Sequence, residues 1–122
     1  MILLDTHAAI WLVQGHRRSR PLSRQASLHL SPASLLELQV LIEIGRLRLA
    51  PSSTVDSFSN DERFRLDEPP AGPWFSEACE LPWTRDPFDR LLVAHARLRR
   101  WRLATADDQL LERLPASAVL AL

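Results

Sequence analysis

The chain has 122 residues, of which 46% are hydrophobic and 25% charged, and this fits a single domain over residues 1–122 with a sizeable core. Its apolar stretches are shorter than the roughly 20 residues of a membrane span, and its start lacks a basic leader, so we expect neither a span nor a signal peptide. A single cysteine, Cys79, excludes an internal disulfide and a cysteine-based zinc site, and we expect a cytoplasmic protein.

The first half of the chain predicts one strand and three helices. Ile-Leu-Leu-Asp at the start is a short apolar run that ends in an acid, typical of a buried strand. Ser31 and Pro32 supply a cap and a first-turn proline for a helix, and Gly15 and Gly45 are helix stops. The predicted elements are a strand over 2–5, helices over 6–14, 21–29 and 32–44, and an Arg-rich polar stretch over 16–20.

The second half alternates short strands with helices. Its clearest break is Pro-Pro-Ala-Gly-Pro at residues 69–73, which we interpret as a loop inside the domain. Short strands that alternate with helices indicate an α/β fold with a parallel sheet covered on both faces. The predicted elements are a weak helix over 51–60, a strand over 63–67, helices over 74–81, 87–99 and 107–113, and strands over 101–105 and 119–122, the last at an edge.

Two acids stand where solubility alone does not require them. Asp5 ends the first strand, where ligands of open α/β sheets bind, although it could equally cap the helix that begins at Thr6. On a helical wheel the polar residues of the helix over 32–44 form one stripe, and Glu37 falls on the opposite side with Ala33 and Leu41. A buried charge there needs a cation or hydrogen bonds, so Glu37 is either a site residue or half of an ion pair with an arginine.

Two further pairs of acids stand at the starts of helices. Asp86 and Asp89 flank Pro-Phe, and one of them can cap the helix while the other, which we take to be Asp89, faces inward. Asp107 and Asp108 follow the strand over 101–105 and pose the same choice. Carboxylates brought together repel one another, so a fold that gathers them needs a cation. Oxygen donors without a Cys or His cluster favour Mg²⁺ or Mn²⁺, which in turn favours hydrolysis of phosphodiesters.

Four segments carry a family resemblance. In order and spacing they resemble PIN domains of the VapC toxin type, least closely between residues 50 and 72. The resemblance implies a three-layer α/β/α sandwich with a central, mostly parallel sheet, metal-dependent cleavage of RNA, a small antitoxin as partner and a homodimer. The segments are Leu-Leu-Asp-Thr-His-Ala from residue 3, Ser-Pro-Ala-Ser-Leu-Leu-Glu-Leu from 31, Arg-Asp-Pro-Phe-Asp-Arg-Leu-Leu-Val-Ala-His-Ala from 85, and Leu-Ala-Thr-Ala-Asp from 103.

The same resemblance implies the roles of individual residues. Two departures from the family pattern, Leu36 in place of a common Trp and Arg100-Trp101 in place of a glycine-containing turn, touch none of the acids. Asp108 remains an alternative to Asp107 as the fourth acid. The metal-binding and catalytic residues would be Asp5, Glu37, Asp89 and Asp107, with Asp86, Asp108, Thr6, His7 and Thr105 as candidate auxiliary residues.

Binding of RNA requires local basic clusters, because the net charge of the chain is zero. Arginines cluster over 17–24 and again over 97–102, although a solvated face is an equal explanation for such runs. We expect Trp11 in the core or an interface rather than as a platform for bases, and His95 in a structural role. The candidate RNA-binding residues are Arg17, Arg18, Arg90, Arg97 and Arg100.

Two other functions compete with a toxin ribonuclease. The main alternative is a non-catalytic PIN-like module that binds RNA or a partner, and the presence of all four acids argues against it. An aspartyl phosphotransferase of the haloacid dehalogenase type would need a second Asp two residues after Asp5, where His7 stands. That chemistry also needs a lysine, and the chain has none.

Overall fold

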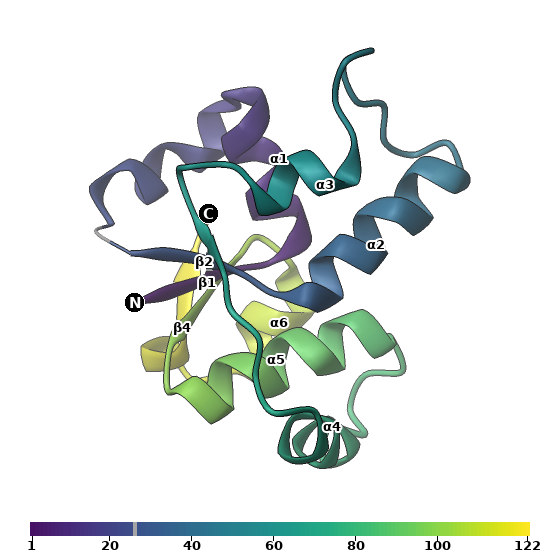
Figure 1. The fold of residues 1–122 in the computed structure, drawn as a ribbon. Helices are drawn as coiled ribbons and strands as arrows, with labels where there is room; N and C mark the ends of the chain where they lie inside the picture. The colour runs from purple at the N-terminus through teal and green to yellow at the C-terminus, as the bar shows by residue number, and fades with distance from the viewer. Residues whose placement is uncertain (26) are drawn as a thin grey trace.

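A five-stranded sheet forms the centre of the molecule (Figure 1). The computed structural model describes residues 1–25 and 27–122. The strands lie in the order β3-β2-β1-β4-β5, and every neighbouring pair is parallel, so the sheet is wholly rather than mostly parallel. The strands are β1 (Ile2–Leu4), β2 (Leu28–Leu30), β3 (Arg65–Leu66), β4 (Arg102–Thr105) and β5 (Val119–Ala121).

Helices cover both faces of the sheet. Because strand side chains alternate between faces, Leu3 packs into one core while Ile2 and Leu4 pack into the other. Within the described residues no helix is long and apolar enough to cross a membrane. The helices are α1 (Thr6–Gln14), α2 (Pro32–Glu43), α3 (Val55–Ser59), α4 (Ala71–Cys79), α5 (Pro87–Arg99) and α6 (Asp108–Arg113), with 3-10 helices η1 (Arg17–Arg24) and η2 (Ala116–Ala118).

The two cores define three layers. One core contains Leu38 of α2 and Phe58 of α3 together with residues of α1, and the other contains Trp74 of α4, Leu92 of α5 and Leu110 of α6. In Figure 1 the sheet separates α1 and α3 on one side from α4, α5 and α6 on the other. The predicted α/β/α sandwich is therefore confirmed.

The predicted helix over 21–29 is wrong. Residues 17–24 form η1, which includes Pro21, and Leu28–Leu30 form β2 between β1 and β3. Pro21 lacks the backbone N–H that the interior of an α-helix needs. The run Leu-His-Leu is too short to show a strand by its own pattern, and it becomes one by pairing with strands that are distant in sequence. The break over 69–73 is also shorter than expected, because Ala71, Gly72 and Pro73 already belong to the first turn of α4.

Candidate active site

A cavity of about 290 Å³ opens at the carboxyl ends of the neighbouring strands β1 and β4. This is the edge at which parallel sheets bind ligands. One of its acids follows directly on β1 and another follows β4 after one residue, and three come from α2 and from the start of α5. The carboxylates that line the cavity are Asp5, Glu37, Asp86, Asp89 and Asp107.

Three of these carboxylates are helix caps as well as cavity residues. Asp5 accepts a hydrogen bond from the backbone N–H of Ala8 at 2.7 Å and begins α1. Asp86 and Asp107 begin α5 and α6 in the same way. Three helix N-termini thus open onto one cavity, and their partial positive charge favours carboxylates there. Capping and a place in the cavity, which the sequence posed as alternatives, occur together.

Glu37 reaches the cavity from the inward face of α2, as the helical wheel predicts. Its carboxylate is half-buried and accepts a hydrogen bond from the buried Oγ1 of Thr6. Thr6 Oγ1 also lies 3.0 Å from Ser34 Oγ, one turn before Glu37 on the same helix. No arginine forms an ion pair with Glu37 in residues 1–25 and 27–122. The structure therefore holds Glu37 by hydrogen bonds between α1 and α2.

The other predicted acids divide clearly. Asp89 is half-buried on the cavity while Asp86 caps α5 by accepting from Phe88 N–H at 2.8 Å. Asp107 and Asp108 are both exposed, but Asp107 accepts from Leu110 N–H at 3.0 Å and lines the cavity, whereas Asp108 does not line it. Thr105 Oγ1 accepts from Asp107 N–H at 3.0 Å, which fixes the turn after β4. The geometry thus favours Asp107 over Asp108 as the fourth acid.

Arg18 is the arginine that lines the acid cavity. Its guanidinium carbon lies 5.1 Å from the ring centre of Trp11, which also lines the cavity and is half-buried. Trp11 thus lies at the cavity and not in the core, so the core alternative of the prediction is wrong, while the interface alternative stays a prediction. His7 completes this side of the wall and is exposed.

The other arginines predicted to bind RNA lie elsewhere. Arg97 and Arg100 line a different cavity together with Trp101. Arg97 lies eight residues after Asp89 on α5, which corresponds to about 12 Å along the helix. Arg90 donates to the carbonyl oxygen of Thr84 at 2.8 Å and thereby ties α5 to the preceding loop. Arg17 is exposed and does not line the acid cavity.

Comparison with known proteins identifies the family. A family model described as PIN domain matches residues 2–116. The chain belongs to the PIN domain family. No curated protein matches this PIN domain.

Solved structures share the fold of this PIN domain. A toxin-antitoxin complex from Klebsiella pneumoniae superposes with a TM-score of 0.71 at 18% identity, over 99% of this chain and 97% of that chain. VapBC2 from Rickettsia felis, bound to a DNA fragment from its promoter, gives 0.70 at 19% identity over 100% and 99%. VapC20 of Mycobacterium tuberculosis, a sarcin-ricin loop cleaving toxin, gives 0.65 at 18% over 94% and 97%. At such low sequence identities, these superpositions establish the common fold alone.

The carboxylates of this PIN domain carry uncompensated negative charge. Burial raises the pKa of Asp89 to about 7, and the charges of the four other carboxylates in the cavity add to the shift. Burial also raises the pKa of Glu37, with Asp86 and Asp5 adding to it and the Thr6 hydrogen bond opposing it. The pKa of the buried Asp5 is likewise raised by burial, against the Thr105 hydroxyl and the Ala8 N–H. Repulsion within the cavity therefore favours binding of a cation.

The donor set of this PIN domain suits Mg²⁺ or Mn²⁺. The cavity offers five carboxylates, no cysteine and one histidine, and hard divalent ions prefer oxygen ligands. Over residues 1–25 and 27–122, no three Asp, Glu, His or Cys side chains lie close enough together to hold an ion. The chemistry of the residues therefore fits such an ion, and side chains would have to move toward one another to bind it.

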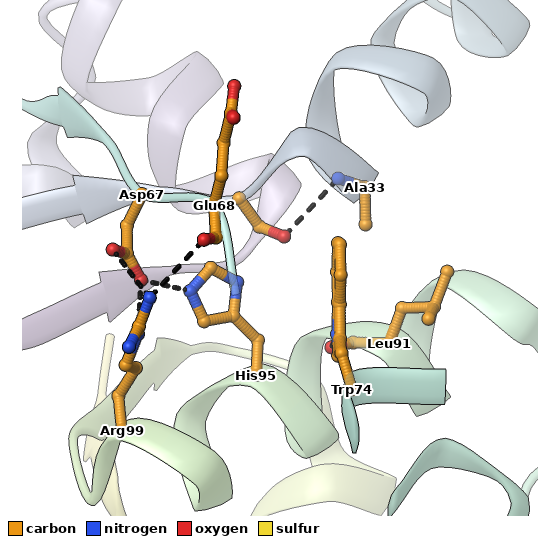
Figure 2. Close-up of polar contacts among 8 residues, drawn as sticks. Ala33, Asp67, Glu68, Trp74, Leu91, His95 and Arg99 are labelled. Atoms are coloured by element: carbon orange, nitrogen blue, oxygen red, sulfur yellow. Dashed lines mark hydrogen bonds and ion pairs between the residues drawn. The ribbon is translucent and has the colours of Figure 1, made fainter. Parts of the chain in front are cut away.

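A second polar cluster of this PIN domain was missed from the sequence (Figure 2). Asp67, directly after β3, lies 2.7 Å from the Nε2 of the fully buried His95 and accepts from Arg99 Nε at 2.9 Å. Burial lowers the pKa of His95 although Asp67 opposes this, so His95 is a neutral donor at neutral pH. The cluster ties the edge strand to α5 and lies outside the acid cavity, which supports the expected structural role of His95. Its long sequence separation left no local signal.

Proposed function

We propose that this chain is a divalent-metal-dependent endoribonuclease that hydrolyses RNA phosphodiesters as the toxin of a toxin–antitoxin pair. The observation that carries the proposal is a single cavity with five carboxylates, none of them in an ion pair within the described part of the chain. Capping accounts for Asp5, Asp86 and Asp107, but Glu37 and Asp89 cap no helix and still line the same cavity. Membership of the PIN domain family gives this convergence a nuclease interpretation.

Each side chain has a distinct task in this proposal. A bound Mg²⁺ or Mn²⁺ would supply a Lewis acid for the phosphate and lower the pKa of an attacking water. Thr6 Oγ1 directs the carboxylate of Glu37 toward the cavity. Arg18, beside the acids, is the cation available to a phosphate oxygen. The residues that would hold the ion are Asp5, Glu37, Asp89 and Asp107, with Asp86 as an auxiliary acid.

The bond change follows from this arrangement. Water adds to phosphorus while the bond from phosphorus to one ribose oxygen breaks, and the products are a phosphate end and a hydroxyl end. Because the attacking group is water, the proposal needs no covalent intermediate on the chain.

The toxin role is supported by the proteins that share the fold. Two of them are described as toxin–antitoxin assemblies and a third as a toxin that cleaves the sarcin-ricin loop. By the same analogy we propose a small antitoxin as partner. The family resemblance leads us to propose a homodimer, and an RNA substrate leads us to propose a cytoplasmic location.

The test of the nuclease is cleavage of cellular RNA by the purified protein with Mg²⁺, with Mn²⁺ and with a chelator. Asp5→Asn and Glu37→Gln should each lower the cleavage rate at least about 100-fold. Loss of a residue that only orients a metal ligand lowers activity by up to about 100-fold, and loss of a ligand itself should cost no less. Asp107→Asn and Asp108→Asn form a matched pair, because the residues are neighbours and only Asp107 lines the cavity. Equal rates for the Asp107 and Asp108 variants would contradict the assignment of the fourth acid.

The toxin role has a separate test. Expression of the protein should arrest bacterial growth, Glu37→Gln should abolish the arrest, and coexpression of a small protein encoded next to the gene should relieve it. RNA cleavage without growth arrest would retain the nuclease and reject the toxin. Binding of RNA without cleavage under any metal would instead indicate a non-catalytic module.

A further inference from the structure

A second hollow, of about 770 Å³, adjoins the acid cavity. The two share His7, Glu37 and Asp86, so they form one continuous depression. The second hollow also has Arg46 and Arg48 in its wall, just beyond the C-terminus of α2. A depression that begins at carboxylates therefore reaches a pair of cations.

The turn after α2 holds these two arginines in place. Gly45, at φ +77°, ends the helix in the left-handed conformation, and Arg46 N–H donates to the carbonyl oxygen of Leu41 at 2.8 Å. Leu47 N–H donates to the same oxygen at 3.2 Å, and the Leu47 side chain is buried in the core. Because Leu47 is anchored between them, the backbone of both exposed arginines is held next to the hollow, and their side chains line it.

Neither guanidinium is neutralised inside the fold. Across residues 1–25 and 27–122, Arg46 and Arg48 form no ion pair with an Asp or Glu side chain. Arg97 and Arg99, by contrast, pair with Glu77 at 3.6 Å and with Asp67 at 2.9 Å. Two unpaired cations beside a substrate-sized depression are available to an anion from outside.

The position of the pair relative to the acids suits a polymeric phosphate. Glu37 and the last residue of α2, Glu43, are six residues apart, so the helix runs roughly 9 Å from Glu37 before the turn that carries the arginines. Carboxylates repel the phosphates of an RNA strand wherever no metal neutralises them, so a strand that crosses the cavity needs cations next to it. Arg18 supplies one cation within the cavity, and Arg46 and Arg48 supply two beyond it.

We propose that Arg46 and Arg48 bind the sugar–phosphate backbone of the RNA substrate on one side of the bond that is cleaved. This assignment rests on the proposed ribonuclease function and adds a substrate subsite to it. Phosphate contacts of this kind position a strand and carry no base specificity. The subsite therefore sets affinity and register, and leaves sequence choice to other contacts.

The direct test is binding of a fluorescein-labelled, mixed-sequence single-stranded RNA of about 20 nucleotides to the full chain in chelator, followed by anisotropy at several salt concentrations. Arg46→Gln/Arg48→Gln should weaken binding roughly tenfold and make the slope of log affinity against log salt shallower by about 1.4, for two lost phosphate contacts. Arg46→Lys/Arg48→Lys should keep most of the affinity. The matched control is Arg65→Gln/Arg113→Gln, which removes the same charge from arginines that line neither hollow.

Two results would overturn the subsite: an unchanged salt slope in the double Gln variant, or an equal change in the control. A cleavage assay adds a second criterion, because kcat/KM should fall more for the long RNA than for a dinucleotide that ends before the arginines. Equal losses on both substrates would mean that the turn merely shapes the acid cavity. Absence of cleavage by the unmodified protein would reject the proposed function, while the binding assay in chelator would still decide the subsite.

Discussion

Asp89 in α5 and Asp67 next to that helix are both half-buried carboxylates, yet their electrostatic surroundings are opposite. Asp89, in the first turn, faces other carboxylates, and burial together with their charge raises its pKa to about 7. Asp67, beside the C-terminal half of the helix, accepts from His95 and Arg99 (Figure 2). Burial favours a raised pKa there too, but these two hydrogen bonds outweigh it and hold the pKa of Asp67 below its ordinary value.

The difference lies in the partners and not in the residue type. Asp67 has its cation within the chain, so it can act as a strut between β3 and α5 without any ligand. Asp89 has none within the described residues, so the fold keeps a destabilised charge that an external cation would relieve. A carboxylate that is left unpaired in a cavity is therefore the better indicator of function than one that is merely buried.

The largest effect on stability should come from removing Asp67, the carboxylate that has partners within the chain. Asp67→Ala removes the acceptor of His95 Nε2 and the partner of Arg99, and we expect it to lower the free energy of unfolding by about 2–3 kcal/mol. His95 is fully buried and its Nδ1 already lacks a partner within the described residues, which leaves the ring without hydrogen bonds after the substitution. Urea denaturation at neutral pH measures the change.

A matched control comes from a pair whose cation is exposed: Asp61 has a side-chain exposure of 14%, close to the 20% of Asp67, but its partner Arg63 is far more exposed than the fully buried His95. Asp61 accepts from Arg63 at 2.6 Å, and Arg63 has a side-chain exposure of 48%, so Asp61→Ala should lower stability by less than about 1 kcal/mol. Equal losses for the two variants would show that burial of the Asp67 cluster adds nothing, and the contrast with Asp89 would lose its structural half.

The sequence predicted the carboxylate site better than it predicted this strut. Glu37 and Asp89 were recognised because a helix has a fixed period, so an acid on the apolar side of a wheel must face inward. Asp67 and His95 lie 28 residues apart on different elements, and no local pattern joins them. Their meeting depends on where β3 joins the sheet, which is a tertiary event.

The same reasoning explains the error over 21–29 and the false choice at the helix caps. The segment over 28–30 becomes a strand only because β1 and β3 lie on either side of it. Asp5 and Asp107 cap helices and line the cavity together, because strand ends and helix starts coincide at this edge of a parallel sheet. A sequence shows each cap separately but does not show that the caps converge.

The next largest effect should come from removing the unpaired charge. Asp89 has an ordinary pKa of 3.8 and a folded pKa of about 7, so the folded chain keeps a proton that the unfolded chain loses as the pH rises. Its contribution to stability is complete below about pH 4 and is lost as the pH rises through about 7. Discounted for partial exposure to solvent, Asp89→Asn should raise the free energy of unfolding by roughly 2 kcal/mol at pH 8 in chelator.

The gain from Asp89→Asn should shrink at pH 5, where the folded protein already carries the proton. Urea denaturation at both pH values measures it, with Asp108→Asn as the control because Asp108 is exposed and does not line the cavity. A gain that does not change between pH 5 and pH 8 would contradict the repulsion assigned to the cavity.

A divalent ion should neutralise the carboxylates of the acid cavity, so that the acids at the start of α5 also gain a cation, as Asp67 near its other end already has. At tenfold excess over its dissociation constant, Mg²⁺ or Mn²⁺ should stabilise the folded state by about 1.4 kcal/mol, and a chelator should reverse this. Asp5→Asn should abolish the response, whereas Asp67→Ala should keep it, because Asp67 lies outside the cavity. Thermal unfolding with and without the ion checks both, and a response that survives Asp5→Asn would place the ion elsewhere.

The smallest expected effect concerns the residue that ends α5. Arg100 is the non-glycine residue with positive φ among those described, at 58°, and it stands where the family resemblance leads us to expect a glycine-containing turn. An L-residue in this conformation is strained, so Arg100→Gly should raise the free energy of unfolding by about 0.5–1 kcal/mol after the added freedom of the unfolded chain is subtracted. Arg97→Gly, inside the helix, should have the opposite effect and lower the free energy of unfolding by about 1 kcal/mol.

Because Arg100→Gly relaxes the end of α5 that holds Arg99 and leaves Asp89 untouched, stabilisation by Mg²⁺ should be the same in Arg100→Gly as in the unmodified protein. A metal response that changed with Arg100→Gly would mean that the two ends of the helix are coupled.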